Sequence, residues 1–108
     1  MPDQVPFLSV CVPTLDQRNG RAMRLLRSVA RWTPDVAMEQ IVEDCQGELR
    51  GWTEPMNKAT ARAHGDYLLL VNDDVEVAEG WLPPLLAALE DPDVWCVTPD
   101  NTHTDGPQ

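Results

Sequence analysis

The chain has 108 residues and a net charge of −10, and 43% of its residues are hydrophobic. This length allows one domain of the usual size and excludes a second globular domain. The longest apolar run, residues 67–71, is far shorter than the roughly 20 residues that cross a bilayer, so we expect no transmembrane segment.

The charge is divided unevenly along the chain. Residues 1–65 carry eight acidic and eight basic residues, whereas residues 66–108 carry ten acidic residues and no Lys or Arg. Such an acidic stretch repels nucleic-acid phosphates and attracts divalent cations, so we expect no nucleic-acid partner. The alternative is that these acidic residues serve only to keep the protein in solution.

The N-terminus and the cysteines indicate a cytoplasmic protein. Residues 1–4 lack the basic start and the apolar core of a signal peptide. The cysteines, Cys11, Cys45 and Cys96, form no CxxC pair and lie in or beside apolar stretches. We therefore expect buried, reduced thiols.

The hydrophobic pattern alternates between strand-like and helix-like segments. In chain order it predicts a strand at 7–12 that ends at Pro13, a helix at 19–32, a strand at 36–44, a helix at 55–64, a strand at 66–72, a helix at 80–90 and a strand at 93–98. This order predicts an α/β fold with an open, mostly parallel sheet and helices on both faces. The whole chain, 1–108, is then a single domain with a polar tail at 99–108. The strand at 66–72 is apolar on both faces, as a central strand is.

Ligands of open parallel sheets bind beyond the carboxyl ends of the strands. Here those ends fall at 13–16, 43–46, 72–74 and 99–101, and acidic residues occur among them. The pair Asp73-Asp74, directly after an apolar strand, points to Mg²⁺ or Mn²⁺, which takes one or two carboxylates and completes its shell with water and phosphate oxygens. The alternative is an ordinary Asn-Asp turn.

Several segments of the sequence carry a family resemblance. They are SVCVPT at 9–14, IVED at 41–44, NKA at 57–59, AHGDYLLLVNDDVEV at 63–77 and GWL at 80–82. Together they resemble family 2 of the glycosyltransferases, which has the GT-A fold, over about residues 8–99. The resemblance implies the nucleotide-binding half of that Rossmann-like fold in a minimal form.

The resemblance also implies roles for individual residues. It places Pro13 and Thr14 beside the base and ribose of a nucleotide-sugar, and Asp44 against the base. It makes Asp74 the ligand of a Mn²⁺ or Mg²⁺ ion that bridges the diphosphate, and Asp73 a ribose contact or a group that positions the metal ligand. The implied activity is transfer of the sugar with inversion.

Three departures from the family pattern bear on that activity. The first acid of the family's Asp-x-Asp motif is Asn72 here, and only twelve residues separate Asp44 from Asn57. The family's acceptor-binding half, which supplies the general base, has no counterpart, although Asp100, Asp105 or a partner chain are candidates for that base. The alternative function is therefore a nucleotide-sugar-binding module or subunit that needs a separate acceptor domain.

Other side chains have both a functional and a structural interpretation. Trp52 is a candidate ligand contact, His103 a candidate third metal ligand, and Lys58 and Arg62 candidate diphosphate contacts; each is otherwise a solvated surface residue. Five arginines at helical spacing form a stripe on the first helix: Arg18, Arg21, Arg24, Arg27 and Arg31. Together with an apolar surface at residues 92–99, this stripe predicts a homo-oligomer, and the alternative is a solvated helix face.

Overall fold

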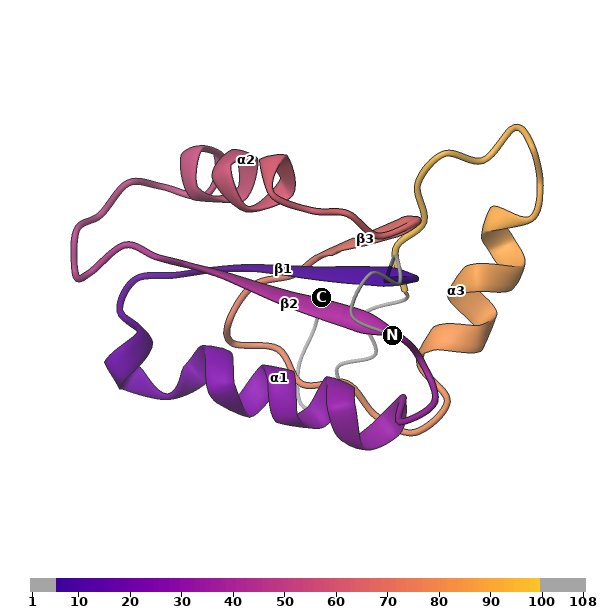
Figure 1. Cartoon of the computed structure of the whole chain (residues 1–108), viewed down its shortest axis with the longest axis horizontal. Coiled ribbons are helices and arrows are strands. Elements are labelled where there is room, and N and C mark those ends of the chain that lie inside the picture. Colours follow the sequence, from indigo (N-terminus) through magenta and orange to yellow (C-terminus); the bar gives the residue numbers. More distant parts are fainter. Residues whose placement is uncertain (1–5, 100–108) are drawn as a thin grey trace, which may run out of the picture. The chain divides into compact units, whose positions relative to one another are not determined.

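The computed structural model describes residues 6–99 of the chain, which divide into two compact units at the boundary between Ala78 and Glu79. The first unit contains, in chain order, β1 (Leu8–Thr14), the 3₁₀ helix η1 (Gln17–Asn19), α1 (Arg21–Trp32), β2 (Met38–Asp44), α2 (Thr53–Ala61) and β3 (Tyr67–Leu70). The second unit contains α3 (Leu82–Leu89). Figure 1 labels these elements.

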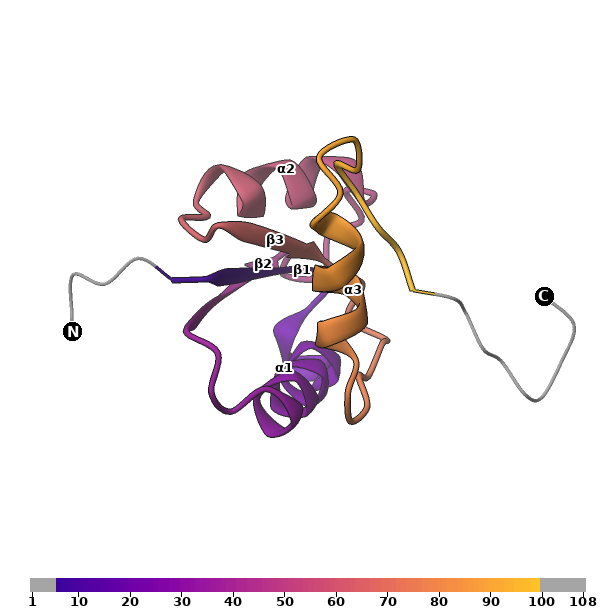
Figure 2. The same ribbon diagram turned by 90° about the vertical axis from the view of Figure 1, so that its right-hand side faces the viewer.

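The sheet of the first unit has the strand order β2-β1-β3, and both pairings are parallel. Leu8 lies opposite Met38 on one side and opposite Tyr67 on the other. Figure 2 shows α1 and α2 on opposite faces of this sheet. The predicted α/β class, an open parallel sheet with helices on both faces, is confirmed.

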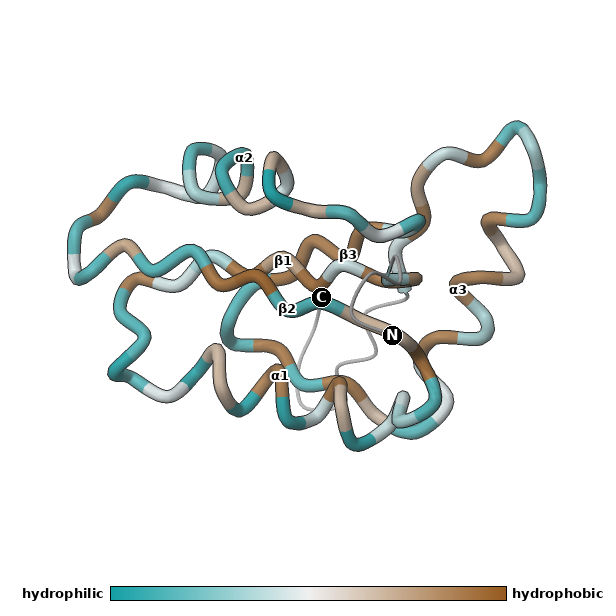
Figure 3. The backbone as a smooth tube through the Cα atoms, viewed as in Figure 1, coloured by the Kyte–Doolittle hydropathy of each residue, from teal (hydrophilic) through white to brown (hydrophobic). Residues whose placement is uncertain are grey.

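The core of the first unit is built around β1, every residue of which is buried. On one face, Cys11 and Ile41 pack with Met56 and Ala59 of α2. α1 buries one face that includes Ala22, Leu25, Leu26 and Val29, as its helical spacing predicts, whereas Ala30 is exposed. Figure 3 shows the result as hydrophobic colouring along β1 and β3 and an alternation of colours along α1.

The prediction that Pro13 ends the first strand is wrong, because β1 continues to Thr14. In a strand, the N–H and C=O groups of successive residues face opposite neighbouring strands, so residues i and i+2 face the same one. The carbonyl of Cys11 accepts from Val71 on the β3 side, so the nitrogen of Pro13 also faces that side, where pairing ends at Cys11 and Leu70. A proline is tolerated at this position because β3 offers no carbonyl there that would need an N–H donor from residue 13.

The prediction of a strand at 93–98 is also wrong, since those residues form no regular element. Asp91 begins a turn instead: its carbonyl accepts from the N–H of Val94, and its carboxylate accepts from the N–H of Asp93. Trp95, expected to need cover, is 93% exposed.

The strand predicted at 66–72 is shorter and less central than expected. Among the described residues, β3 pairs only with β1 and lies at an edge of the sheet, and Leu68 and Leu70 are about half exposed (50% and 47%). The expectation of a strand covered on both faces is therefore wrong for this part of the chain.

Two further expectations concern the thiols and the membrane. Cys11 and Cys45 are buried free thiols, as expected, but Cys96 is exposed. Burial raises the pKa of both buried thiols, which keeps them in the unreactive protonated form. Within residues 6–99, no helix has the length and apolar character that a membrane span requires.

The connection from α2 to β3 is anchored at the amino end of the sheet. The Ser9 hydroxyl donates to Glu39 (2.6 Å) and accepts from the N–H of Gly65 (2.8 Å). The Glu39 carboxylate also accepts from the N–H of His64. The Ser9 hydroxyl hydrogen bond holds the pKa of Glu39 below its usual value, so this anchor contains an ionised carboxylate at neutral pH.

We predict that Gly65→Ala destabilises the fold by about 1–3 kcal/mol, as overpacking of a filled site does. A Cβ at Gly65 would lie 2.7 Å from the Ser9 hydroxyl oxygen and 2.8 Å from the Ser9 backbone nitrogen, and the backbone cannot move aside cheaply. Urea unfolding measures the change, with Asn57→Ala on the exposed side of α2 as the control. Equal midpoints for Gly65→Ala and the wild type would show that the close approach does not exist.

Candidate functional site

A cavity of about 370 Å³ opens at the carboxyl edge of the sheet, and we call it the carboxyl-edge cavity. The chain segments that follow β1, β2 and β3 all contribute to its lining. Its residues are Pro13, Thr14, Leu15, Arg21, Cys45, Glu48, Leu49, Arg50, Gly51, Trp52, Asn72, Asp73 and Asp74. The structure therefore brings together four of the five predicted site residues, Pro13, Thr14, Asp73 and Asp74.

Thr14 and Asp73 connect the ends of β1 and β3. The Thr14 hydroxyl donates a hydrogen bond to the Asp73 carboxylate at 2.7 Å. Thr14 itself is only 2% exposed. This hydrogen bond fixes one oxygen of Asp73 and leaves the other available. Asp73 is thus held in one orientation by a rigid neighbour, as a group that positions a ligand must be.

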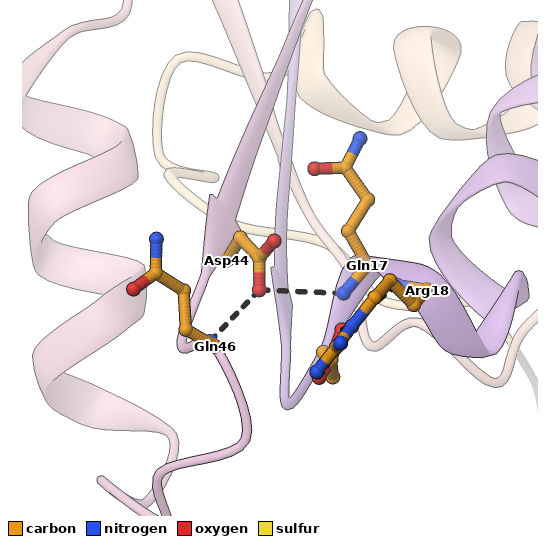
Figure 4. Close-up of polar contacts among 5 residues, drawn as sticks. Gln17, Arg18, Asp44 and Gln46 are labelled. Atoms are coloured by element: carbon orange, nitrogen blue, oxygen red, sulfur yellow. Dashed lines mark hydrogen bonds and ion pairs between the residues drawn. The ribbon is translucent and has the colours of Figure 1, made fainter.

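Asp44, the fifth predicted residue, organises the loops rather than lining the carboxyl-edge cavity. Its Oδ1 accepts from the backbone N–H of Gln46 (2.8 Å) and from that of Gln17 (3.3 Å), as Figure 4 shows. One carboxylate oxygen therefore joins the loop after β1 to the loop after β2. Its predicted contact with a nucleobase stays a prediction.

The loop after β1 is braced by a second aspartate. Asp16 caps η1 by accepting from the Arg18 N–H at 2.9 Å, and its carboxylate also binds the Arg18 guanidinium at 2.6 Å. These hydrogen bonds from Arg18 lower the pKa of Asp16 to about 2, so the pair is charged at neutral pH. Beside it, the N–H of Gly47 donates to the carbonyl of Leu15 at 2.7 Å and ties the two loops together again.

The segment between β2 and α2 forms a wall of the carboxyl-edge cavity that the sequence analysis largely missed. Arg50 lies there, within 3.0 Å of Glu48 and 3.9 Å of Glu54. Gly47 and Gly51 adopt positive φ values of 86° and 75°. In the sequence, these two glycines lie four residues apart and Trp52 follows the second one. Glycines spaced in this way could have indicated a loop with positive φ angles at this point.

Asp74 is an exposed carboxylate of the carboxyl-edge cavity, and no side chain of the described residues forms an ion pair with it. Across residues 6–99, no cluster of three or more His, Cys, Asp or Glu side chains is arranged to hold a metal ion. Asp73 and Asp74 alone fit a hard cation that takes one or two carboxylates and completes its shell with phosphate oxygens and water. They do not form a self-sufficient protein cage.

The other candidate side chains are not at this cavity or lie outside the described residues. Lys58 pairs with Glu54 at 3.4 Å, and Arg62 pairs with Glu43 at 2.6 Å, so both cations already have carboxylate partners. The candidates Asp100, His103 and Asp105 lie outside the described residues.

The chain matches the model of a known protein family. The sequence profile described as "Glycosyl transferase family 2" matches residues 41–107. This range begins within β2 and includes the loop with Arg50 and Trp52 and the acidic segment 72–74. No curated protein and no solved structure matches the chain.

We predict that Asp44→Ala speeds amide hydrogen exchange at Gln17 and Gln46 and costs about 1 kcal/mol of stability, because both N–H groups lose their acceptor. Asp44→Asn is the matched control, since it keeps a side-chain oxygen in the same place. Exchange resolved by NMR at these two amides measures the effect. Unchanged exchange in the Ala variant would show that Asp44 does not join the loops.

Proposed function

Because the chain belongs to glycosyl transferase family 2, we propose that it binds a nucleotide-diphosphate sugar in the carboxyl-edge cavity, with Mn²⁺ or Mg²⁺, and takes part in transfer of the sugar with inversion. The acceptor is a second substrate. The single observation that carries this proposal is the pair Asp73 and Asp74 at the end of β3, within one cavity with Thr14.

The charges of the carboxyl-edge cavity support a diphosphate ligand. A dianionic diphosphate is repelled by carboxylates unless a divalent cation lies between them. Asp74 would hold that cation, and Asp73, oriented by Thr14, would hold it or the ribose. When bound, the cation supplies charge neutralisation for the departing diphosphate.

The protein residues position the donor in this proposal. Pro13 and Thr14 lie at the end of the fully buried strand β1, so they provide a rigid surface for the nucleoside. Asp44 keeps the loops on either side of that surface in place and leaves its Oδ2 for a polar edge of the base. Arg21 and Arg50 also line the carboxyl-edge cavity and add positive charge to it.

A second candidate function, a nucleotide-sugar-binding module that needs a separate acceptor domain, is favoured by the carboxylates of the carboxyl-edge cavity. Within the described residues these are Glu48, Asp73 and Asp74. Glu48 pairs with Arg50, Asp73 accepts from Thr14, and the proposal assigns Asp74 to the cation. None of the three is then left as the general base that an inverting displacement needs. Release of free sugar or transfer to an added acceptor distinguishes the enzyme from the module.

We also propose that the chain forms a homo-oligomer through the arginines of α1. The predicted stripe is wrong at Arg18, which lies on η1 and pairs with Asp16. Of the eight basic residues, Arg21, Arg27 and Arg31 have no carboxylate within 4.0 Å in the described part of the chain, and all three lie on α1. Arg24, Arg27 and Arg31 line a groove of about 460 Å³. The acidic residues after position 78 of a second copy have the complementary charge, which orients association more than it strengthens it.

We predict that Asp74→Ala reduces nucleotide-sugar affinity in Mn²⁺ to the value measured without metal, and leaves the fold intact because the side chain is exposed. Asp66→Ala, at the other end of the same strand, is the matched control and keeps the metal effect. Isothermal titration calorimetry measures both. Wild-type affinity of Asp74→Ala in Mn²⁺ would remove Asp74 from the site.

For assembly, we predict sedimentation above the monomer mass of 12.1 kDa at tens of micromolar and a shift toward monomer in Arg27→Glu. Lys58→Glu, a charge reversal away from α1, is the control and leaves the association unchanged. A wild-type monomer in both low and moderate salt would contradict the oligomer.

A further inference from the structure

Trp52 is the aromatic side chain among the residues that line the carboxyl-edge cavity. It is a large apolar side chain that lines the cavity and is 47% exposed. In the described residues the cation–π contact is that of Arg31 over Trp32, and no hydrogen bond engages the Trp52 indole. An indole left half in water forgoes burial worth about 25 cal/mol for each Å² of apolar surface.

The backbone of Trp52 is nevertheless fixed. Its carbonyl accepts from the N–H of Met56 at 3.1 Å, and Met56 is 2% exposed in the core beneath α2. Gly51, directly before it, adopts a φ of 75° that turns the chain into the helix. The indole is therefore carried by a rigid helix start and not by a loose loop.

The strand order places Trp52 and the acidic residues on different sides of the carboxyl-edge cavity. Trp52 follows β2, Asp73 and Asp74 follow β3, and β1 lies between these strands with Pro13 and Thr14 at its end. Two strand spacings separate β2 from β3, on the order of 10 Å. An elongated ligand that bridges the strands thus meets Asp73 and Asp74 at one end. At the other end it meets the aromatic face of Trp52, in a wall that also contains the Glu48–Arg50 ion pair.

We propose that Trp52 is the stacking platform for the nucleobase of the donor, an inference that rests on the proposed function. The diphosphate and its cation belong beside Asp73 and Asp74, and the transferred sugar is joined to that diphosphate. The base is the opposite end of the molecule, so it reaches the β2 side, where Trp52 offers an aromatic face. Stacking on indole is tolerant of the base because every base has a π-face, and polar groups at its edge then select among bases.

The assignment predicts an effect that depends on the base alone. With Mn²⁺ present, Trp52→Ala binds the tightest ligand from a panel of UDP, GDP, CDP and dTDP about tenfold more weakly, a typical loss for one stacked base. Trp52→Phe keeps an aromatic ring and retains most of the affinity. Inorganic pyrophosphate, which has no base, binds the wild type and both variants equally.

A spectroscopic signature accompanies the affinity change. With Mg²⁺ as the cation, the chosen nucleotide quenches tryptophan fluorescence in the wild type and in Trp32→Phe, the matched control at the end of α1, but not in Trp52→Phe. Circular dichroism verifies that each variant is folded. Quenching that survives in Trp52→Phe would overturn the stacking assignment.

The outcomes separate this inference from the proposed function. Metal-dependent nucleotide binding that is equally tight in Trp52→Ala overturns the stacking role and leaves the proposed function standing. A loss seen with the nucleotide-sugar but absent with the nucleoside diphosphate means that Trp52 contacts the sugar, which also overturns it. Failure of the wild type to bind pyrophosphate and all four nucleotides with either cation overturns both.

Discussion

The parallel pairing of β1 between β2 and β3 is the constraint on which the rest of the first unit depends. A right-handed crossover from β1 to β2 puts α1 on one face, and the crossover from β2 back past β1 to β3 puts α2 on the other. The chain therefore reverses its direction across the sheet between β1 and β3, and a crevice forms beyond such a reversal. The Thr14–Asp73 hydrogen bond spans that point.

The loops around the crevice are held by polar groups that also set its charge. Asp44 and Asp16 use their carboxylates on backbone N–H groups and on Arg18, so they stabilise the loops as fixed charges. Asp74 forms no ion pair with a side chain in the described part of the chain. Loops held in this way, with Asp74 left without an ion-pair partner, support the proposal that the donor binds together with a cation.

The fold class and most of the cavity could be predicted from local patterns. The apolar runs, the helical spacing of Leu25, Leu26 and Val29, and the acids after an apolar strand all depend on neighbours in the sequence. The predictions of secondary structure were wrong where contacts with other parts of the fold determine whether a segment is a strand. Pro13 stays in β1 because β3 ends early beside it, and residues 93–98 form no strand because Asp91 turns the chain.

The cavity wall after β2 was missed in part for the same reason: Trp52 was a candidate ligand contact, but Glu48, Leu49 and Arg50 were not. Arg50 and Trp52 reach the cavity only because the loop that holds them is tied to Leu15 and Asp44, contacts between segments some 30 residues apart in the sequence. Asp44 itself was correctly placed at the end of β2, but its hydrogen bonds to the backbone of Gln17 and Gln46 have no sequence signature. Acidic residues at strand ends can bind a ligand or can accept hydrogen bonds from the backbone of a loop, and only the folded structure distinguishes these two roles.

The central claim is that the ends of β1, β2 and β3 form one metal-dependent nucleotide site. Paramagnetic broadening of backbone amide NMR signals by Mn²⁺, with and without a nucleoside diphosphate, tests it most directly. The account predicts broadening centred on Asn72, Asp73 and Asp74 that extends to Thr14 and strengthens when the nucleotide is added, with Phe7, Ala37 and Asp66 at the amino edge unaffected. Broadening centred on the acidic residues after position 78, or broadening that the nucleotide does not change, would contradict it.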